Sequence, residues 1–160
     1  MNGARSYDVQ VSLSASFTSP VIDRMDLKGY LYTPDERLTD NTYYWRVRCT
    51  DQDGQKGGWS HVWNFEIDTQ GPAAPELTSP ENDSELSDSS PYFDWSDVNG
   101  ASVYELQVDN AESFDNPEIQ DSTLTSSGFA STGSLLDDTY HWRVRARDGQ
   151  RNWGDWTPVW

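Results

Sequence analysis

The amino-acid sequence predicts an all-β protein made of two tandem β-sandwich units. Three observations lead to this prediction: alternation of apolar and polar residues, a long internal repeat, and turn residues between the alternating segments. Residues 140–147, for example, place apolar side chains at every second position, which is typical of a strand buried on one face. No segment shows the periodicity of an amphipathic helix. Short strands separated by turns such as Asn99-Gly100 and Asp148-Gly149 favour a sandwich.

The internal repeat relates residues 2–63 to residues 99–160 at a constant offset of 97 positions. Of the 62 aligned pairs, 24 are identical, and many of these are aromatic residues, Gly or Pro. Because 160 residues exceed one period by only 63, the sequence opens partway through a repeat. We therefore expect an incomplete unit over residues 1–69 and a nearly complete unit over residues 70–160, with the boundary in the Gly- and Pro-containing segment 68–75.

Several segments resemble strands of a fibronectin type III domain, whose strands are lettered A to G. Phe93-Asp94-Trp95 and residues 104–108 resemble strands B and C, residues 135–146 resemble strand F, and residues 156–160 resemble strand G. The Tyr-Trp-Arg-Val-Arg segment with a following Trp-Ser is similar to tandem modules of prokaryotic cell-surface and secreted proteins. The resemblance implies the following strands for the second unit: A at 76–79, B at 92–96, C at 103–108, C′ at 119–124, E at 128–131, F at 140–147 and a shortened G from 156.

The same alignment implies that the first unit starts at strand C, residues 6–12, runs to strand G and lacks strands A and B. The absent counterparts of Phe93 and Trp95 are each worth roughly 2–3 kcal/mol when buried, a large part of the roughly 5–15 kcal/mol that stabilises a domain. The first unit should therefore not be stable alone. Three interpretations remain open: an excerpt of a longer repeat array, completion by strands of another copy in a filament or swapped oligomer, or partial disorder.

The composition excludes several partners. With 27 acidic and 11 basic side chains the net charge is −16, so nucleic acid and anionic membrane surfaces should be repelled. Residues 1–25 contain no apolar core of a signal peptide, and membrane insertion is not expected. The single cysteine excludes an internal disulfide, and Cys49 is expected to be a small buried thiol on the inward face.

Arginine and tryptophan recur together in both units. Arg46 and Arg48 face away from the predicted core side of their strand, and the next strand brings Trp residues. Arginines stacked on indole rings form cation–π contacts worth about 0.5–2 kcal/mol each. Because the set occurs in both repeats, we interpret it as a structural ladder rather than a ligand site. Its predicted members are Arg46, Arg48, Trp59, Trp63, Arg143, Arg145, Trp156 and Trp160.

The best candidate for a ligand contact is the loop that contains Trp153. This residue has no counterpart in the first unit, where Lys56 occupies its place. Loop aromatics beside arginine are common interface anchors, and an indole can stack on a sugar ring. The candidate ligand-binding residues are Trp153, Arg151 and Asn152; packing of Trp153 on the neighbouring unit or on the ladder is an equal alternative.

No cofactor or metal site is expected. Asp51-Gln52-Asp53-Gly54 resembles the start of a calcium loop but lacks the downstream bidentate Glu, so only weak surface binding of calcium is expected. His61 and His141 lie in predicted strands, with no catalytic motif nearby. The sequence thus predicts a non-catalytic, extracellular spacer or adhesion module. The alternatives are a glycan- or protein-binding module of a secreted enzyme, or a filament subunit completed by strand exchange.

Overall fold

The computed structural model describes residues 3–160, which form strands and loops and contain no helix able to span a membrane. The contacts divide the chain into two units, with the division between Asp68 and Thr69, one residue from the expected position. The strands are β1 (Ser6–Ser12), β2 (Ile22–Leu27), β3 (Asn41–Thr50) and β4 (Trp63–Ile67) in the first unit, and β5 (Leu77–Ser79), β6 (Tyr92–Trp95), β7 (Val103–Asp109), β8 (Ile119–Leu124), β9 (Gly128–Ala130) and β10 (His141–Arg147) in the second.

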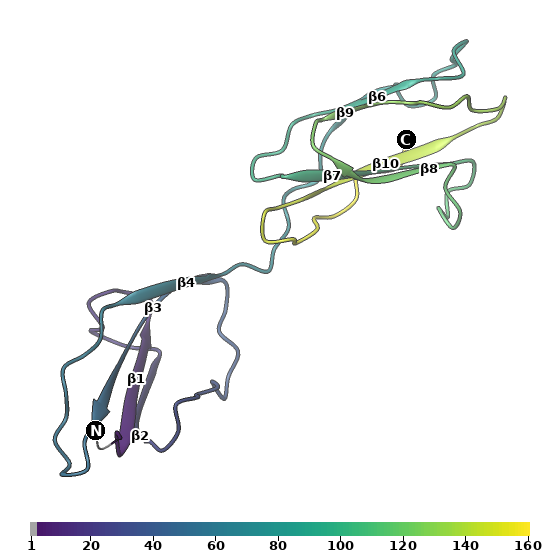
Figure 1. The fold of residues 1–160 in the computed structure, drawn as a ribbon. Coiled ribbons are helices and arrows are strands. Elements are labelled where there is room, and N and C mark those ends of the chain that lie inside the picture. The colour runs from purple at the N-terminus through teal and green to yellow at the C-terminus, as the bar shows by residue number, and fades with distance from the viewer. Residues whose placement is uncertain (1–2) are drawn as a thin grey trace. The chain divides into compact units, whose positions relative to one another are not determined.

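The second unit is a two-layered β-sandwich of fibronectin type III-like topology (Figure 1). One sheet has the order β5-β6-β9 and the other β10-β7-β8, which correspond to strands A-B-E and F-C-C′. Residues 157–160 continue the second sheet as strand G, since the Thr157 N–H donates to Val144 O and Trp160 and Trp142 exchange backbone hydrogen bonds. All the strands expected from the sequence are present here, with small differences at their ends.

Aromatic side chains fill the space between the two sheets of the second unit. Phe93 of β6 meets Trp142 edge to face at 5.2 Å between ring centroids, and Trp95 meets Tyr104 in the same way at 5.7 Å. Leu106 is fully buried between these pairs. Such edge-to-face pairs add about 0.5–1.5 kcal/mol beyond the area they bury. The sheet that contains β6 therefore covers the apolar face of β7 and β10 completely.

The first unit has a single sheet with the order β2-β1-β3-β4 (Figure 1). The bounds of β1 and β2 equal those of β7 and β8 shifted by 97 positions, and the pairing of β1 with β3 repeats that of β7 with β10. No second sheet covers these strands within the described residues, as expected from the absence of strands A and B.

One strand expected in the first unit is not formed. Residues 31–33 align with β9, which is strand E of the second unit, but they adopt no strand conformation. In the second unit β9 pairs only with β6. Because the first unit has no equivalent of β6, the segment has no backbone partner, and Tyr30 and Leu31 are exposed. A strand without a ladder partner leaves its backbone groups to water.

The missing sheet also leaves the apolar face of β1 less buried than that of β7. The polar side chains Ser6 and Asp8 are buried, whereas Tyr7 and Val9, on the side that faces the core in the second unit, are half-exposed. Cys49, which pairs with Tyr7, is exposed, so its predicted burial was wrong. Its counterpart Ala146 is completely buried because the second unit has its covering sheet.

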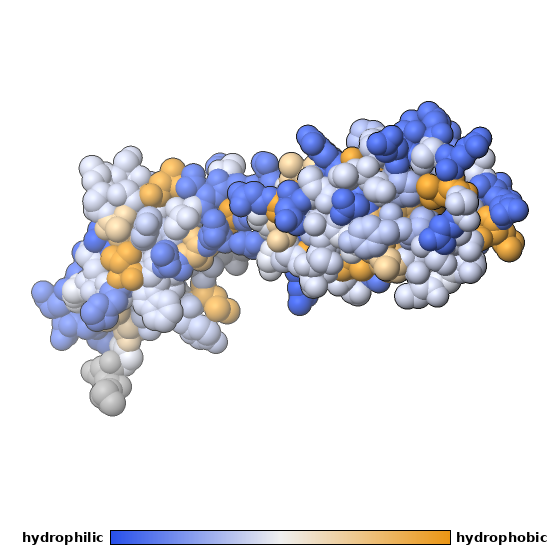
Figure 2. All heavy atoms as spheres, turned by 90° about the horizontal axis from the view of Figure 1, so that it is seen from above, coloured by the Kyte–Doolittle hydropathy of each residue, from blue (hydrophilic) through white to orange (hydrophobic). Residues whose placement is uncertain are grey.

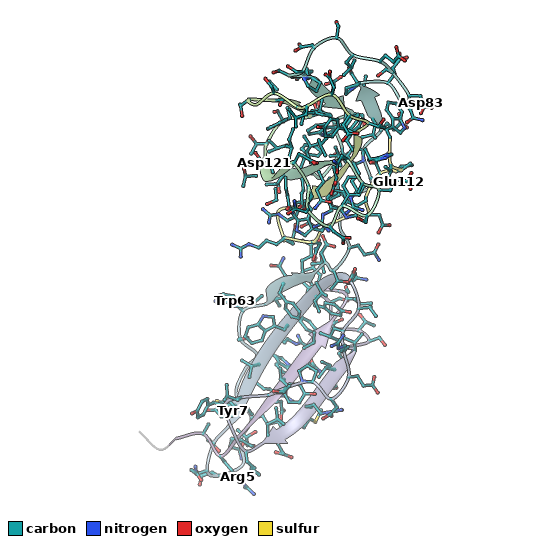
Figure 3. The ribbon with its side chains drawn as sticks, turned by 90° about the vertical axis from the view of Figure 1, so that its right-hand side faces the viewer. Arg5, Tyr7, Trp63, Asp83, Glu112 and Asp121 are labelled. Atoms are coloured by element: carbon teal, nitrogen blue, oxygen red, sulfur yellow. The ribbon has the colours of Figure 1, made fainter. Side chains whose placement is uncertain are left out.

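We call this side of the β1-β3-β4 sheet, which has no second sheet over it in the described residues, the open face. It is only partly open, because Val11 and Tyr43 are buried in a small cluster against which Tyr32 and Leu38 pack. Its members project on one side, because successive side chains alternate across a strand. Trp63 and Phe65 of β4 are 65% and 38% exposed, and Figure 2 shows apolar side chains at the surface of the first unit. Tyr7 and Trp63, which are labelled in Figure 3, lie toward opposite ends of the open face. The open face comprises Tyr7, Val9, Val11, Tyr43, Trp45, Val47, Cys49, Trp63 and Phe65.

Candidate functional site

The most regular constellation of side chains is a stack of alternating arginine and aromatic residues on the outer face of β10. Arginines at alternate positions of this strand project to the side opposite the core. Each aromatic ring of the stack comes from a loop beside the sheet or from the segment that leads into strand G. The guanidinium-to-centroid distances are 4.0 Å for Arg143–Phe114, 4.4 Å for Arg143–Trp156, 4.5 Å for Arg145–Trp156, 4.5 Å for Arg145–Trp153 and 5.0 Å for Arg147–Trp153.

Side chains of β7 fix the arginines in register. Arg143 Nε and Nη2 donate to Gln107 Oε1 at 2.9 and 2.7 Å, and Arg145 Nε and Nη2 donate to Glu105 Oε2 at 2.8 and 2.6 Å. Burial, together with the nearby charge of Arg145, lowers the pKa of Arg143 from its ordinary value. Charge-assisted hydrogen bonds to guanidinium groups are directional. The stack therefore connects two strands and the loops beside them.

The first unit contains a shorter version of the same stack. Arg46 contacts Phe17 at 4.1 Å and Trp59 at 4.5 Å, and Arg48 contacts Trp59 at 4.4 Å. Gln10 Oε1 accepts from Arg46 Nε and Nη2 at the same distances as in the second unit. The structure thus brings six of the eight predicted ladder residues together, in two sets of three. The sets are Arg46, Arg48 and Trp59 in the first unit and Arg143, Arg145 and Trp156 in the second, whereas Trp63 and Trp160 lie elsewhere.

Where the second unit has Trp153, the first unit ends its stack with a buried ion pair. Asp8 Oδ2 accepts from Arg48 Nε and Lys56 Nζ, both at 2.9 Å, and the Asp8 side chain has no exposed surface. Burial alone would raise the pKa of Asp8, but the hydrogen bonds from Lys56, the Asp26 N–H and Arg48 together lower it to about 2. Asp8 is therefore a carboxylate at neutral pH and a fixed partner of two cations.

The prediction was wrong for Trp63 and Trp160. They lie on the core side, where Trp63 contacts Trp45 at 6.4 Å and Trp160 contacts Trp142 at 6.1 Å between ring centroids. The backbone explains the change of side. Thr157 and Trp160 are three residues apart, yet they bond Val144 and Trp142, which are two apart. One extra residue in an edge segment reverses the side to which the following side chains point.

Arg147 and two phenylalanines of the stack were missed from the sequence. Phe17 and Phe114 cap the first arginine of each stack, and each adopts a left-handed backbone conformation, with φ of 54° and 53°. Phenylalanine is uncommon in this conformation. Both belong to the identical pairs at the offset of 97, which was the available signal. The recurrence in both units indicates that the ring is positioned for its stacking on arginine.

The loop with the candidate ligand contacts is held by its own hydrogen bonds. The Asn152 N–H and Nδ2 donate to Asp148 Oδ1 and Oδ2 at 2.8 and 3.0 Å, and Trp153 stacks on Arg145 and Arg147. These hydrogen bonds lower the pKa of Asp148 although burial would raise it. Gly154 lies so close to Pro72 O that a Cβ there would be 2.0 Å from this oxygen. Of the three candidates, only Arg151 is exposed.

The candidate calcium loop has a similar internal role. Asp51 Oδ1 accepts from the backbone N–H groups of Asp53 and Gln55, at 3.0 and 2.7 Å. Within residues 3–160, no group of three or more His, Cys, Asp or Glu side chains is arranged to hold a metal ion. The carboxylate of Asp51 thus closes the turn between β3 and the following segment.

Comparisons with known proteins show a likeness to solved structures. No protein-family model matches the sequence, and no curated protein matches it. Among solved structures, the chain is similar to the FN1–FN3 domains of chicken CNTN1, with 14% sequence identity and a TM-score of 0.49. The match covers 99% of this chain and 55% of that one, so the chain spans about half the length of that structure.

Proposed function

We propose that this chain is a non-catalytic structural module that acts outside the cell as a spacer or adhesion unit in a tandem array of β-sandwiches. The observation that carries the proposal is the arginine–aromatic stack, because the same device rigidifies the outer face of the F and C strands in both units. In repeat arrays that act as spacers, features present in every repeat typically stabilise the fold and do not bind a ligand.

The charged groups support a structural role. Asp8 and Glu105, the buried acids at equivalent positions of β1 and β7, are each engaged by arginine of the neighbouring strand. Trp153, the candidate for sugar stacking, already packs against two arginines. Stacking of a sugar on Trp153 would need a ring face that these arginines do not occupy, so the spacer function is favoured over glycan binding at this loop.

A spacer must remain folded under tension, which can be measured by single-molecule force spectroscopy on the full chain held at its two ends. The second unit should unfold in one step that resists force. Trp156→Leu removes two cation–π contacts without touching the core and should lower the unfolding free energy of this unit by about 1–2 kcal/mol. The unfolding force should fall accordingly.

The matched control is Leu136→Ala in the same unit, since Leu136 is 83% exposed and should leave the unfolding force unchanged. Extension of the wild-type chain without any resisted step would contradict the spacer function. An equal unfolding force in the wild type and Trp156→Leu would show that the stack does not supply the stiffness.

A further inference from the structure

The turn between β6 and β7 of the second unit carries a dipeptide with a chemistry of its own, Asn99-Gly100. We propose that Asn99 is a site of spontaneous deamidation, at which water converts the asparagine of this turn into a mixture of aspartate and isoaspartate. The reaction needs no enzyme and no cofactor, and the spacer function does not depend on it. Three observations carry the proposal: the geometry of the turn, the hydrogen bonding of the reacting groups, and the contrast with two Asp-Gly dipeptides of the same chain.

The reaction is an attack by a backbone nitrogen on the neighbouring side chain. Gly100 N gives up its proton to a base and forms a bond with Asn99 Cγ. The bond from Cγ to Nδ2 breaks, and the amide nitrogen takes up a proton and leaves as ammonia, so that a cyclic succinimide remains. Water then opens the ring. Cleavage between the nitrogen and Cγ gives aspartate, and cleavage between the nitrogen and the main-chain carbonyl carbon gives isoaspartate, whose main chain runs through Cβ and Cγ.

The turn presents both reacting residues to solvent. The Ala101 N–H donates to Val98 O at 3.1 Å, which places Asn99 and Gly100 at the two central positions of a β-turn. Both are exposed, and Gly100 has φ of 83°, in the region that glycine adopts without steric cost. Apart from its chain neighbours, no atom lies within 4 Å of the place that a Cβ of Gly100 would take. The ring therefore has room to form.

Neither reacting group is held by a hydrogen bond. Among residues 3–160, the Gly100 N–H donates to no acceptor and the Asn99 side chain has no hydrogen-bond partner. By contrast, Asn110 Nδ2 donates to Asp138 Oδ2 at 3.3 Å. Asn99 is also the only asparagine within residues 3–160 that precedes a glycine. Glycine has no Cβ to hinder the approach of its nitrogen to the side chain.

Two other dipeptides of the described residues could form such a ring, Asp53-Gly54 and Asp148-Gly149, but each has a reacting group engaged. In the first, the glycine N–H donates to Asp51 O at 3.2 Å. In the second, the buried carboxylate accepts from the N–H and Nδ2 of Asn152 at 2.8 and 3.0 Å. An ionised carboxylate also resists attack by a nucleophile because it already carries negative charge. The structure therefore singles out Asn99.

Isoaspartate lengthens the main chain of this turn by one carbon. The turn is fixed at its start, where the Val98 N–H donates to Tyr104 Oη at 3.0 Å and the Val98 side chain packs against the core. The added carbon displaces Ala101 relative to Val98 and should break the hydrogen bond between them. The aspartate product keeps the original backbone and adds only a charge. The two products should therefore differ in the order of the turn.

The test follows isoaspartate in the full chain kept at mildly alkaline pH, through enzymatic methylation of isoaspartate in a protease digest. A synthetic peptide of residues 96–103 gives the rate for the same sequence without the fold. Asn99 should react within about tenfold of the rate in the peptide, because exposed loop tips open locally at little cost in free energy. The digest separates this turn from the dipeptide Asn2-Gly3, whose asparagine lies outside the described residues. A slower reaction of Asn99, or equal isoaspartate at Asp53 or Asp148, would overturn the proposal.

The effect on the turn is tested on the purified isoaspartate form, with Asn99→Asp as the control of equal charge and normal backbone. Amide exchange of Ala101 should be faster by at least about tenfold in the isoaspartate form than in the wild type, since its hydrogen bond is lost. Exchange in Asn99→Asp should match the wild type. The same exchange rate in the isoaspartate form and in Asn99→Asp would overturn the predicted disruption of the turn.

Discussion

The loop after strand F contains one position at which both repeats have a left-handed backbone conformation but carry different residues. Gly54 has φ of 83° and its counterpart Arg151 has φ of 76°. The flanking hydrogen bonds are equivalent, since Asp51 N donates to Gln55 O and Asp148 N donates to Asn152 O. Glycine adopts the left-handed region without steric cost, whereas arginine does so with strain. The loop of the second unit is thus strained at Arg151.

We expect Arg151→Gly to stabilise the second unit by roughly 0.5–1 kcal/mol, because it relieves the strain of a side chain at positive φ. Thermal unfolding of the full chain, followed through the amide signals of β7 and β10, measures the change. The reciprocal control is Gly54→Ala, which should destabilise the first unit by a similar amount, since no atom crowds a Cβ at this position. A loss of stability in Arg151→Gly would mean that the arginine side chain makes a contact worth more than the strain.

At the scale of the elements, β1 and β3 are joined by the ion pair of Asp8 with Arg48 and Lys56. The pKa of Asp8 is lowered from 3.8 to about 2, so in the unfolded chain this carboxylate takes up a proton at a higher pH than in the folded chain. Its contribution to stability is complete above about pH 5 and is lost as the pH falls through 4 toward 2. A shift of this size corresponds to about 2 kcal/mol.

We therefore expect the first unit to lose about 2 kcal/mol of stability between pH 5 and pH 2 through Asp8 alone. Amide signals of β1, followed during denaturant unfolding at several pH values, measure this loss. Asp8→Asn should be less stable at pH 7 and should depend less on pH in this range. Asp35→Asn is the control, because its pair with Arg24 is exposed and contributes little. The same pH dependence in wild type and Asp8→Asn would contradict the assigned role.

The strands show what could be predicted from sequence alone. The bounds of β1 and β8 were predicted because alternation and the offset of 97 are local properties of the sequence. The absence of a strand at 31–33 and the exposure of Cys49 were not predicted, because both depend on a sheet that only the second unit has. The positions of the ladder arginines could be predicted, because side chains alternate across strand F. The placement of Trp160 and Phe114 could not, because it depends on an extra residue before Trp160 and on the left-handed backbone of Phe114, which the alternating pattern does not reveal.

At the scale of the whole molecule, one repeated sequence gives two units of unequal completeness. In the second unit β7 is buried on both faces, by the opposite sheet and by the arginine–aromatic stack. In the first unit β1 is covered by the stack on its polar side, whereas its apolar side lacks an opposite sheet and buries only Val11, with Tyr7 and Val9 half-exposed. Burial of apolar area is the main stabilising contribution in folding. The two units should therefore differ widely in stability although their strands coincide.

The most direct test of this difference is native-state hydrogen exchange, resolved by residue, on the full chain at neutral pH. Equivalent amides are compared: Leu106 with Val9, Val108 with Val11, and Val144 with Val47. We expect exchange in the second unit to be slower by at least about 100-fold, because its core strands open only on global unfolding. Equal protection of the two sets would contradict the assignment of an open face to the first unit.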